Sequence, residues 1–273
     1  MHPSFDLSGK IAVITGGAGV LGEQHARAII AARGIPVLVD SVGARVTELA
    51  TKLSNEFNLN VPGFPADVTK PNDVKRVLAE VLQRNGRVDI LINNAASNPK
   101  VEGSEPASFS RFESFSIDQW NADIALGINS AFICCQVFGT EMARRGAGVI
   151  LNVSSELGLI GPDQRIYRLP NLPDTLQPAK PVTDSITKAA IIGLTRYLAT
   201  YWAARGVRVN AICPGGVTQG QPDEFVNRLT NLIPMSRLAR VDEYQGAVIF
   251  LCSDASSYMT GSVLAIDGGR TTW

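Results

Sequence analysis

Histidine and cysteine are scarce in this chain of 273 residues, which holds two histidines and four cysteines. His2 stands at the N-terminus and His25 in a helix-like segment, so the sequence offers no histidine set for a zinc ion and we expect no metal. No CxxC pair occurs either. We therefore expect four reduced thiols in a cytoplasmic protein rather than a disulfide framework.

An excess of either charge is also absent. Lys and Arg total 25, Asp and Glu total 25, and the formal net charge is +0. Without a basic run, nothing in the composition attracts the chain to nucleic acid or to an anionic membrane. The first residues lack a secretory signal, and no uninterrupted apolar run approaches the ~18 residues that span a bilayer. We therefore expect a small-molecule substrate, with neither nucleic acid nor a membrane as a partner.

What the chain has is a regular alternation of strand and helix patterns. Hydrophobic residues make up 45% of it, enough for a large core. Short apolar runs without polar alternation predict strands buried on both faces, at 11–14, 36–39, 61–65, 90–92, 149–153, 207–212 and 263–266. Helices are predicted at 20–32, 42–56, 71–83, 117–145, 185–204 and 243–252. This order predicts an α/β fold with one doubly wound sheet, as a single domain over 1–273.

Two long irregular stretches interrupt the alternation, at 96–114 and at 158–183. Long loops in a compact domain are usually functional. We expect the insertion 158–183 and a loop at about 214–235 to bound the substrate site. In an open α/β sheet the ligand crevice lies at the carboxyl ends of the strands. Several polar or glycine landmarks fall at predicted strand ends: Gly16–Gly22, Asp40, Asn93, Ser155 and Pro214.

The segment Gly17-Ala18-Gly19-Val20-Leu21-Gly22 is a GxGxxG that follows the first strand and opens a helix. Its glycines let backbone N–H groups approach a pyrophosphate at the helix N-terminus. Asp40 ends the second strand, where a carboxylate accepts hydrogen bonds from a ribose diol and repels a 2′-phosphate. This predicts NAD(H) rather than NADP(H). The alternative is a packing turn, with Asp40 as a helix cap.

Other segments follow in order: Asp67-Val68, Asn93-Asn94-Ala95-Ala96, Asn152-Val153-Ser154-Ser155, Lys188, Asn210-Ala211-Ile212-Cys213-Pro214-Gly215 and Asp267-Gly268-Gly269. Together with Thr15-Gly16 and the glycine turn, they resemble the short-chain dehydrogenase/reductase family, in its short single-domain branch, over nearly the whole chain. The resemblance implies a Rossmann-type parallel sheet of seven strands in the order 3-2-1-4-5-6-7. It also implies an oxidoreductase that uses a nicotinamide cofactor.

By that resemblance, Asp67 and Val68 frame the adenine, and the segment Pro214-Gly215-Gly216-Val217 lies against the nicotinamide. The other implied cofactor residues are Gly16, Gly17, Gly19, Val20, Leu21, Gly22, Asp40, Asn94, Ala95, Ala96 and Lys188. One departure lies in the turn, where Val20 occupies the place of the short branch's middle glycine. Because Gly19 stands one residue earlier, we expect the cofactor still to bind.

The implied catalytic residues show a larger departure. Asn129 would support a proton relay, Ser155 would polarise the substrate oxygen, and Lys188 would hold the nicotinamide ribose. The family's acid–base Tyr, four residues before the Lys, is replaced by Asp184. Residues i and i+4 share a helix face, so we expect Asp184 to form an ion pair with Lys188 in the site. An Asp beside an ammonium is ionised at neutral pH and donates no proton readily.

Four interpretations of Asp184 stay open. The protein remains a dehydrogenase with Asp184, or a water it holds, as base; Tyr167 replaces the missing Tyr; the site runs a non-redox dehydration, isomerisation or lyase step; or the change is an inactivating or engineered one. A helix N-cap explains Asp184 as well. A binding module that senses NAD(H) without turnover is a further alternative.

The loops carry many polar side chains, which favour a hydroxylated or anionic small molecule over a steroid or a fatty acyl chain. The insertion and the helix at 194–202 resemble members linked to bacterial sugar pathways, including those of nonulosonic acids. Ala189, Ala190 and Gly193 form a small-residue stripe that permits close helix approach. We therefore expect a homodimer or homotetramer.

Overall fold

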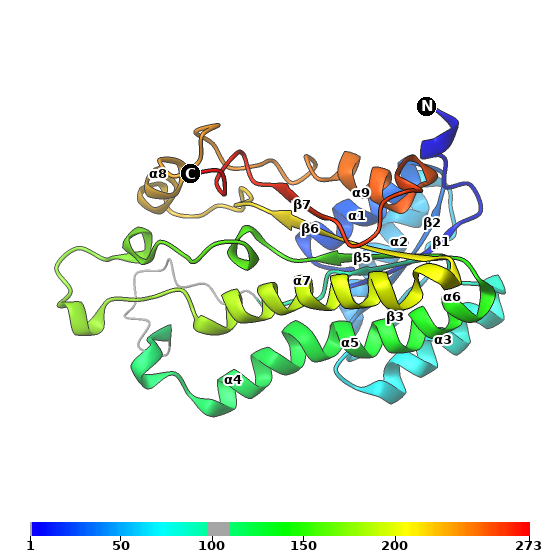
Figure 1. Ribbon diagram of the computed structural model, residues 1–273, viewed down its shortest axis with the longest axis horizontal. Helices are drawn as coiled ribbons and strands as arrows, with labels where there is room; N and C mark the ends of the chain where they lie inside the picture. Colours follow the sequence, from blue (N-terminus) through cyan, green and yellow to red (C-terminus); the bar gives the residue numbers. More distant parts are fainter. Residues whose placement is uncertain (1, 98–109) are drawn as a thin grey trace.

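The structure is a computed structural model that describes residues 2–97 and 110–273. Its centre is one parallel sheet in the order β3-β2-β1-β4-β5-β6-β7 (Figure 1). The strands are β1 (Ile11–Thr15), β2 (Ile35–Asp40), β3 (Gly63–Pro65), β4 (Ile90–Asn93), β5 (Gly148–Val153), β6 (Val207–Pro214) and β7 (Val263–Ile266). The predicted α/β class and strand order are confirmed. Of the predicted loop 96–114, residues 98–109 lie outside the described residues.

Side chains of the central strands alternate between two hydrophobic cores, as the two-residue period of a strand requires. In β1, Ile11 and Val13 enter one core, and Ala12 and Ile14 enter the other. The first core is covered by α3 (Pro71–Asn85), by the long helix formed from α4 (Ile117–Ile124), α5 (Ser130–Cys134) and α6 (Thr140–Arg145), and by α7 (Val182–Trp202). The second is covered by α1 (Val20–Ala31), α2 (Gly43–Phe57) and α9 (Gln245–Cys252) (Figure 1).

The long helix runs without a break from Ile117 to Arg145, with two π-helical turns at Ala125–Asn129 and Cys135–Gly139. Its 29 residues include an 18-residue stretch with a mean hydropathy of 1.4, so the helix could cross a membrane by length and composition alone. In the fold, however, its apolar side covers the sheet, and Phe138 and Met142 are fully buried. The helix is therefore part of the protein core.

The insertion 158–183 contains two short 3₁₀ turns, Gln164–Tyr167 and Asp174–Leu176, and otherwise irregular chain. It packs on a helix that the sequence did not predict, α8 (Asp223–Thr230), which lies in the loop 214–235. A small separate hydrophobic cluster joins them, made of Ile166, Tyr167, Phe225, Leu229, Ile233 and Leu238. The insertion 158–183 and the loop 214–235 therefore form one end of the molecule, beside the carboxyl ends of the strands (Figure 1).

Candidate active site

The glycine turn between β1 and α1 is closely packed on its inner side. A Cβ on Gly22 would lie 2.2 Å from the carbonyl oxygen of Gly16, so no side chain fits there. A Cβ on Gly19 would meet only that same carbonyl, at 3.2 Å, and the rest of its surroundings are open. Val20, the unusual residue of the turn, is 44% exposed. The turn therefore presents backbone amides at the N-terminus of α1, as a pyrophosphate requires.

Asp40 lies at the end of β2, beside this turn. Its carboxylate accepts hydrogen bonds from the backbone amides of Ala18 (3.2 Å) and Val42 (3.0 Å). Arg45 donates from its guanidinium to the carbonyl of Ala18 (2.9 Å). The carboxylate is thus held at the edge of the turn. The sequence motifs did not identify the nearby cation of Arg45.

The end of β4 is tied to the same turn. The side-chain amide of Asn94 donates to the carbonyls of Thr15 and Gly16, at 3.1 Å each. The hydroxyl of Thr15 accepts from the amides of Asn94 (3.0 Å) and Ala95 (3.1 Å). These bonds hold the predicted cofactor residues of two strands together.

The implied adenine residues lie after β3. Val68 is buried. The Asp67 carboxylate accepts from the amide (2.9 Å) and the hydroxyl (2.7 Å) of Thr69, and these bonds lower the pKa of Asp67. Asp67 therefore closes a local turn, a role that is compatible with an adenine contact.

Two adjacent serines follow β5, and their surroundings differ. Ser154 donates its hydroxyl proton to the carbonyl of Lys188 (2.7 Å) and so ties β5 to α7. Ser155 caps the 3₁₀ turn Glu156–Gly158, where its oxygen accepts from the amide of Leu157 (3.2 Å). Its hydroxyl proton has no acceptor among the described residues. Ser155, rather than Ser154, can therefore donate to a substrate oxygen.

Asp184 and Lys188 line one small cleft at the start of α7, together with Ala96, Ser97, Asp123, Gly127, Pro181, Thr183 and Thr187. The placement of Asp184 and Lys188 on one face follows the i, i+4 expectation. The expected ion pair between Asp184 and Lys188 does not form. Asp184 pairs with Lys180, at 2.5 Å, and both side chains are nearly buried, at 11% and 10% exposure.

Lys180 was not among the predicted site residues, although it stands four residues before Asp184 and the spacing rule that predicts Lys188 applies equally to it. Lys188 itself is half-buried, and its ammonium lies 3.5 Å from the carbonyl oxygen of Val153. Burial lowers the pKa of Lys188, the charge of Asp184 raises it, and the charge of Lys180 lowers it. The Asp184 carboxylate at the cleft is therefore paired with the ammonium of Lys180, and a second carboxylate, that of Asp123, also lines the cleft.

The structure does not bring Asn129 to this cleft. Asn129 is exposed, and the residues of the long helix that line the cleft are Asp123 and Gly127. Two residues along a helix turn a side chain by roughly 200°, so Asn129 and Gly127 point in nearly opposite directions. Gly127 leaves room for α7, because a Cβ there would lie 2.5 Å from Thr187. Asp123 accepts a hydrogen bond from the Thr183 hydroxyl (2.5 Å).

Tyr167 also lies away from Asp184 and Lys188. It is 7% exposed and packs in the cluster between the insertion and α8, with its ring 5.5 Å from that of Phe225. It is not among the described residues that line the cleft. The insertion therefore uses Tyr167 as a packing residue.

The segment after β6 lies beside the end of β7. The amide of Gly215 donates to the carbonyl of Ile266 at the end of β7 (3.0 Å), and Val217 pairs with Ala239 in an isolated bridge. Pro214 ends β6 and is paired with Ile266. The predicted nicotinamide segment thus lies at the same edge of the sheet as Ser155 and the glycine turn.

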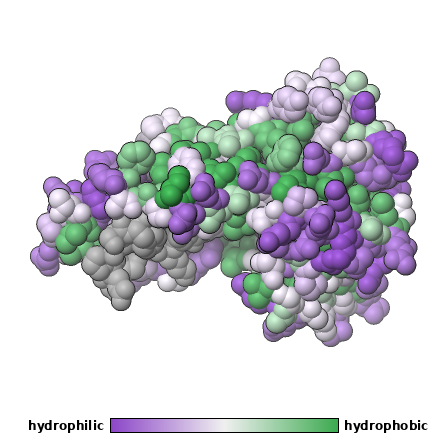
Figure 2. Space-filling model, turned by 90° about the horizontal axis from the view of Figure 1, so that it is seen from below, coloured by the Kyte–Doolittle hydropathy of each residue, from purple (hydrophilic) through white to green (hydrophobic). Residues whose placement is uncertain are grey.

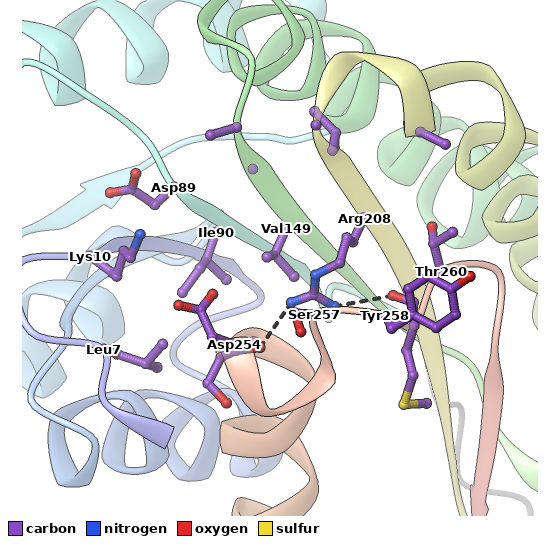
Figure 3. A pocket seen from close by; sticks show the side chains of 18 of the residues that line it. Leu7, Lys10, Asp89, Ile90, Val149, Arg208, Asp254, Ser257, Tyr258 and Thr260 are labelled. Atoms are coloured by element: carbon purple, nitrogen blue, oxygen red, sulfur yellow. Dashed lines mark hydrogen bonds between the residues drawn. The ribbon is translucent and has the colours of Figure 1, made fainter. Parts of the chain in front are cut away.

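A cavity of about 650 Å³ lies at the opposite edge of the sheet (Figure 3). It is lined by the amino ends of β4, β5 and β6 and by the segment before β7. There Arg208 donates to the carbonyls of Ser253 (3.0 Å) and Met259 (3.2 Å). None of the predicted site residues lines this cavity. Its size therefore does not identify the active site.

A nucleotide turn, a serine and a half-buried lysine at the carboxyl edge of such a sheet define a dinucleotide-dependent oxidoreductase by arrangement. Comparison with known families agrees. Residues 10–167 match the family described as short chain dehydrogenase, and residues 179–271 match the one described as enoyl-(acyl carrier protein) reductase. The chain belongs to the short-chain dehydrogenase/reductase family and is an oxidoreductase.

Similar proteins include two dehydrogenases that match along almost their whole length. The 2-dehydro-3-deoxy-D-gluconate 5-dehydrogenase of Bacillus subtilis is 32% identical over 98% of this chain and 97% of its own. The D-threitol dehydrogenase of Mycolicibacterium smegmatis is 32% identical over 98% and 95%. Among solved structures, a gluconate 5-dehydrogenase from Burkholderia cenocepacia in complex with NADP and tartrate is 27% identical, covers 99% of this chain and 98% of its own, and superposes with a TM-score of 0.85.

Proposed function

We propose that this protein is an NAD(H)-dependent oxidoreductase that acts on a hydroxyl or carbonyl group of a sugar, a polyol or a related polar molecule. The observation that carries the proposal is the meeting of Ser155, Lys188 and the glycine turn at one edge of the sheet. The polar character of the substrates named for the relatives supports the substrate class.

The residues present fit a nicotinamide dinucleotide. The open side of Gly19 and the N-terminus of α1 suit the pyrophosphate, and Asp40 suits the adenosine ribose. When bound, the cofactor accepts or supplies a hydride. The hydroxyl of Ser155 donates to the substrate oxygen, and the ammonium of the half-buried Lys188, which lines the cleft, would hold a ribose.

Asp184 does not serve as a ready proton donor in this arrangement. Its carboxylate forms an ion pair with the ammonium of Lys180 at 2.5 Å. The two opposite charges largely cancel, so the pair adds little net charge beside Lys188. An ionised carboxylate only accepts hydrogen bonds. The non-redox alternative, with Asp184 as general base, uses the same cleft and differs in whether the nicotinamide is reduced.

An assay against a panel of polyols, sugars and sugar acids tests the proposal. With NAD⁺ present, we expect at least one polyol or sugar acid to reduce the cofactor, followed at 340 nm. We expect Ser155→Ala to lose about 10²- to 10³-fold in kcat, the range for one lost donor to a reacting oxygen. Ser257→Ala, at an exposed serine of the opposite edge, is the matched control and keeps full activity.

Three results would contradict the proposal. Product formation without cofactor reduction supports the non-redox reaction. Cofactor binding with no turnover of any compound supports a sensor or an inactivated enzyme. Equal activities of the Ser155→Ala variant and the parent would remove Ser155 from the site.

Three further expectations, on domain organisation, assembly and location, belong with this proposal. We propose a single catalytic domain over 1–273, a homodimer or homotetramer, and a cytoplasmic location. All four cysteines are free and buried, and burial raises the pKa of Cys135 to about 12. Such thiols are compatible with a reducing compartment.

A further inference from the structure

A groove that the proposed function does not use lies at the end of the molecule formed by the insertion. Its volume is about 330 Å³, and it is lined by residues 111–113, which precede α4, and by part of the insertion 158–183. This size is within the range of cavities that hold small ligands. We call it the arginine groove, because Arg111, Arg165 and Arg168 line it.

Hydrogen bonds to the backbone hold one wall of the arginine groove in place. Gln177, only 7% exposed, accepts from the amide of Leu169 (2.8 Å) and donates to the carbonyls of Leu169 (3.0 Å) and Leu172 (2.7 Å). Arg111 donates to the carbonyls of Asp174 (2.8 Å) and Gln177 (3.3 Å), which joins the segment before α4 to the insertion. The groove is therefore formed before any ligand arrives, and its first guanidinium is fixed in position.

Three guanidinium groups line the groove against two carboxylates, those of Glu113 and Asp174. Arg165 donates to Asp163 through Nε and Nη2, and Arg168 donates to Asp174 through Nη2. No described residue accepts from Nη1 of either arginine. The side chains of Glu113 and Asp174 are 70% and 83% exposed, and exposed ion pairs contribute little to stability. An oxyanion that enters the groove therefore finds donors that it can engage.

A short stretch of chain joins the groove to the cleft of Asp184. Gln164 lines the groove, and its Oε1 accepts from the backbone amide of Lys180 (2.8 Å), whose side chain pairs with Asp184. Ala179 lines the groove and Pro181 lines the cleft. Two residue steps span at most about 7 Å. A six-carbon sugar that carries a phosphate is at least as long as this separation.

We propose that the arginine groove binds an oxyanion of the substrate, at the end away from the reacting hydroxyl or carbonyl group. This inference rests on the proposed function and narrows its substrate class to acidic sugars, either sugar phosphates or sugar acids. The planar N–H pairs of guanidinium groups match the oxygens of a phosphate or a carboxylate. The arginines act in binding and take no part in the hydride transfer, so they decide which substrate is accepted.

The test compares three compounds that differ in charge, each with NAD⁺: neutral D-glucitol, D-glucitol 6-phosphate and D-gluconate. We expect KM for at least one of the two acids to be about 10- to 100-fold below that for D-glucitol, the effect of one or two charged hydrogen bonds. The double variant Arg165→Gln/Arg168→Gln should lose most of this difference through KM, with a much smaller change in kcat. Arg144→Gln removes an exposed arginine that pairs with Glu141 on α6; it is the matched control and leaves both constants unchanged.

Titration calorimetry of the NADH-loaded protein measures the same site without turnover. We expect D-glucitol 6-phosphate or D-gluconate to bind to the parent about tenfold or more tightly than D-glucitol or inorganic phosphate, and to lose this advantage in the double variant. Whether the phosphate or the carboxylate binds more tightly distinguishes a sugar phosphate from a sugar acid. Thermal unfolding checks that the variant is folded.

Unchanged affinity of the acids in the double variant overturns the inference, as does the failure of both acids to bind more tightly than D-glucitol. Inorganic phosphate that binds as tightly as D-glucitol 6-phosphate also overturns it, because the groove is then not part of a substrate site. If D-glucitol is oxidised with the same KM as the acids, the proposed function stands and the inference fails. If the acids bind through the arginines but no compound reduces NAD⁺, the proposed function fails and the groove remains the anion site.

Discussion

At the scale of single residues, the site depends on which polar groups are already satisfied. Ser154 is bonded to α7 and Ser155 keeps its proton available. Asp184 forms an ion pair with Lys180, whereas no described residue donates a hydrogen bond to the carboxyl of Glu156. Ser154 therefore holds the structure, and Ser155 can still donate its hydroxyl proton. Because the two serines carry the same hydroxyl group, their hydrogen-bond partners decide which of them can donate to a ligand.

Cofactor choice is a prediction at this scale. Asp40 lies at the edge of the glycine turn and should favour NAD⁺ over NADP⁺, which its charge repels. By titration calorimetry we expect Asp40→Ala to weaken NAD⁺ binding about tenfold, the effect of one lost charged hydrogen bond, and to narrow the preference. Asp40→Asn keeps an oxygen that accepts from the amides of Ala18 and Val42 but removes the negative charge. It therefore shows whether the charge or the hydrogen bonds to the turn set the preference.

Asp254→Ala, an exposed aspartate at the far edge of the sheet, is the control and should leave both affinities unchanged. Equal or tighter binding of NADP⁺ to the parent would refute the prediction. In that case Arg45, which lies at the same turn, becomes the first residue to test as a contact for the 2′-phosphate.

At the scale of elements, the site depends on how closely the turn after β5 approaches α7. Gly158 lies at the end of that turn, and a Cβ there would be 2.6 Å from the hydroxyl oxygen of Ser154 and 2.8 Å from the carbonyl oxygen of Lys188. The missing side chain lets strand and helix meet. Ser155 and Lys188 depend on this contact for their relative position.

We therefore predict that Gly158→Ala destabilises the protein by about 1–3 kcal/mol, the usual cost of overpacking. Gly161→Ala, three residues later, is a matched control, because nothing lies within 4 Å of its Cβ. Urea unfolding followed by circular dichroism measures both. Equal free energies of unfolding for the two variants would show that the turn moves away from α7 without strain.

At the scale of the whole molecule, the parallel sheet brings distant segments to one edge, and the insertion with α8 extends that end. Figure 2 shows hydrophobic side chains across the middle of the face on which α4 lies, with hydrophilic residues gathered on the larger part of the molecule. On α7, Tyr197 and Tyr201 are 63% and 61% exposed and stack at 5.7 Å. With the open Gly193 between turns, this face of α7 is suited to contact a second copy.

We expect light scattering to give a dimer or tetramer at micromolar concentration. Tyr201→Glu places a charge on the exposed face of α7 and should reduce the assembly to a smaller species. Tyr258→Glu serves as the comparison, because Tyr258 is fully exposed beside the large cavity at the other edge of the sheet. A monomeric parent, or dissociation by Tyr258→Glu alone, would contradict this interface.

The sequence by itself determined the approximate positions of the strands and the glycine turn, because these follow from short-range hydrophobic patterns and from motifs a few residues long. The sheet order followed from the family that those motifs resemble. It placed Asp184 and Lys188 on one helix face for the same reason. Only the tertiary structure decided that Lys180 is the partner of Asp184, that Gly127 rather than Asn129 faces the cleft, and that Tyr167 packs against α8. It also revealed that the carboxyl of Glu156 is buried. Ion pairing, side-chain direction and burial depend on neighbours from other segments, and no local pattern of residues contains them.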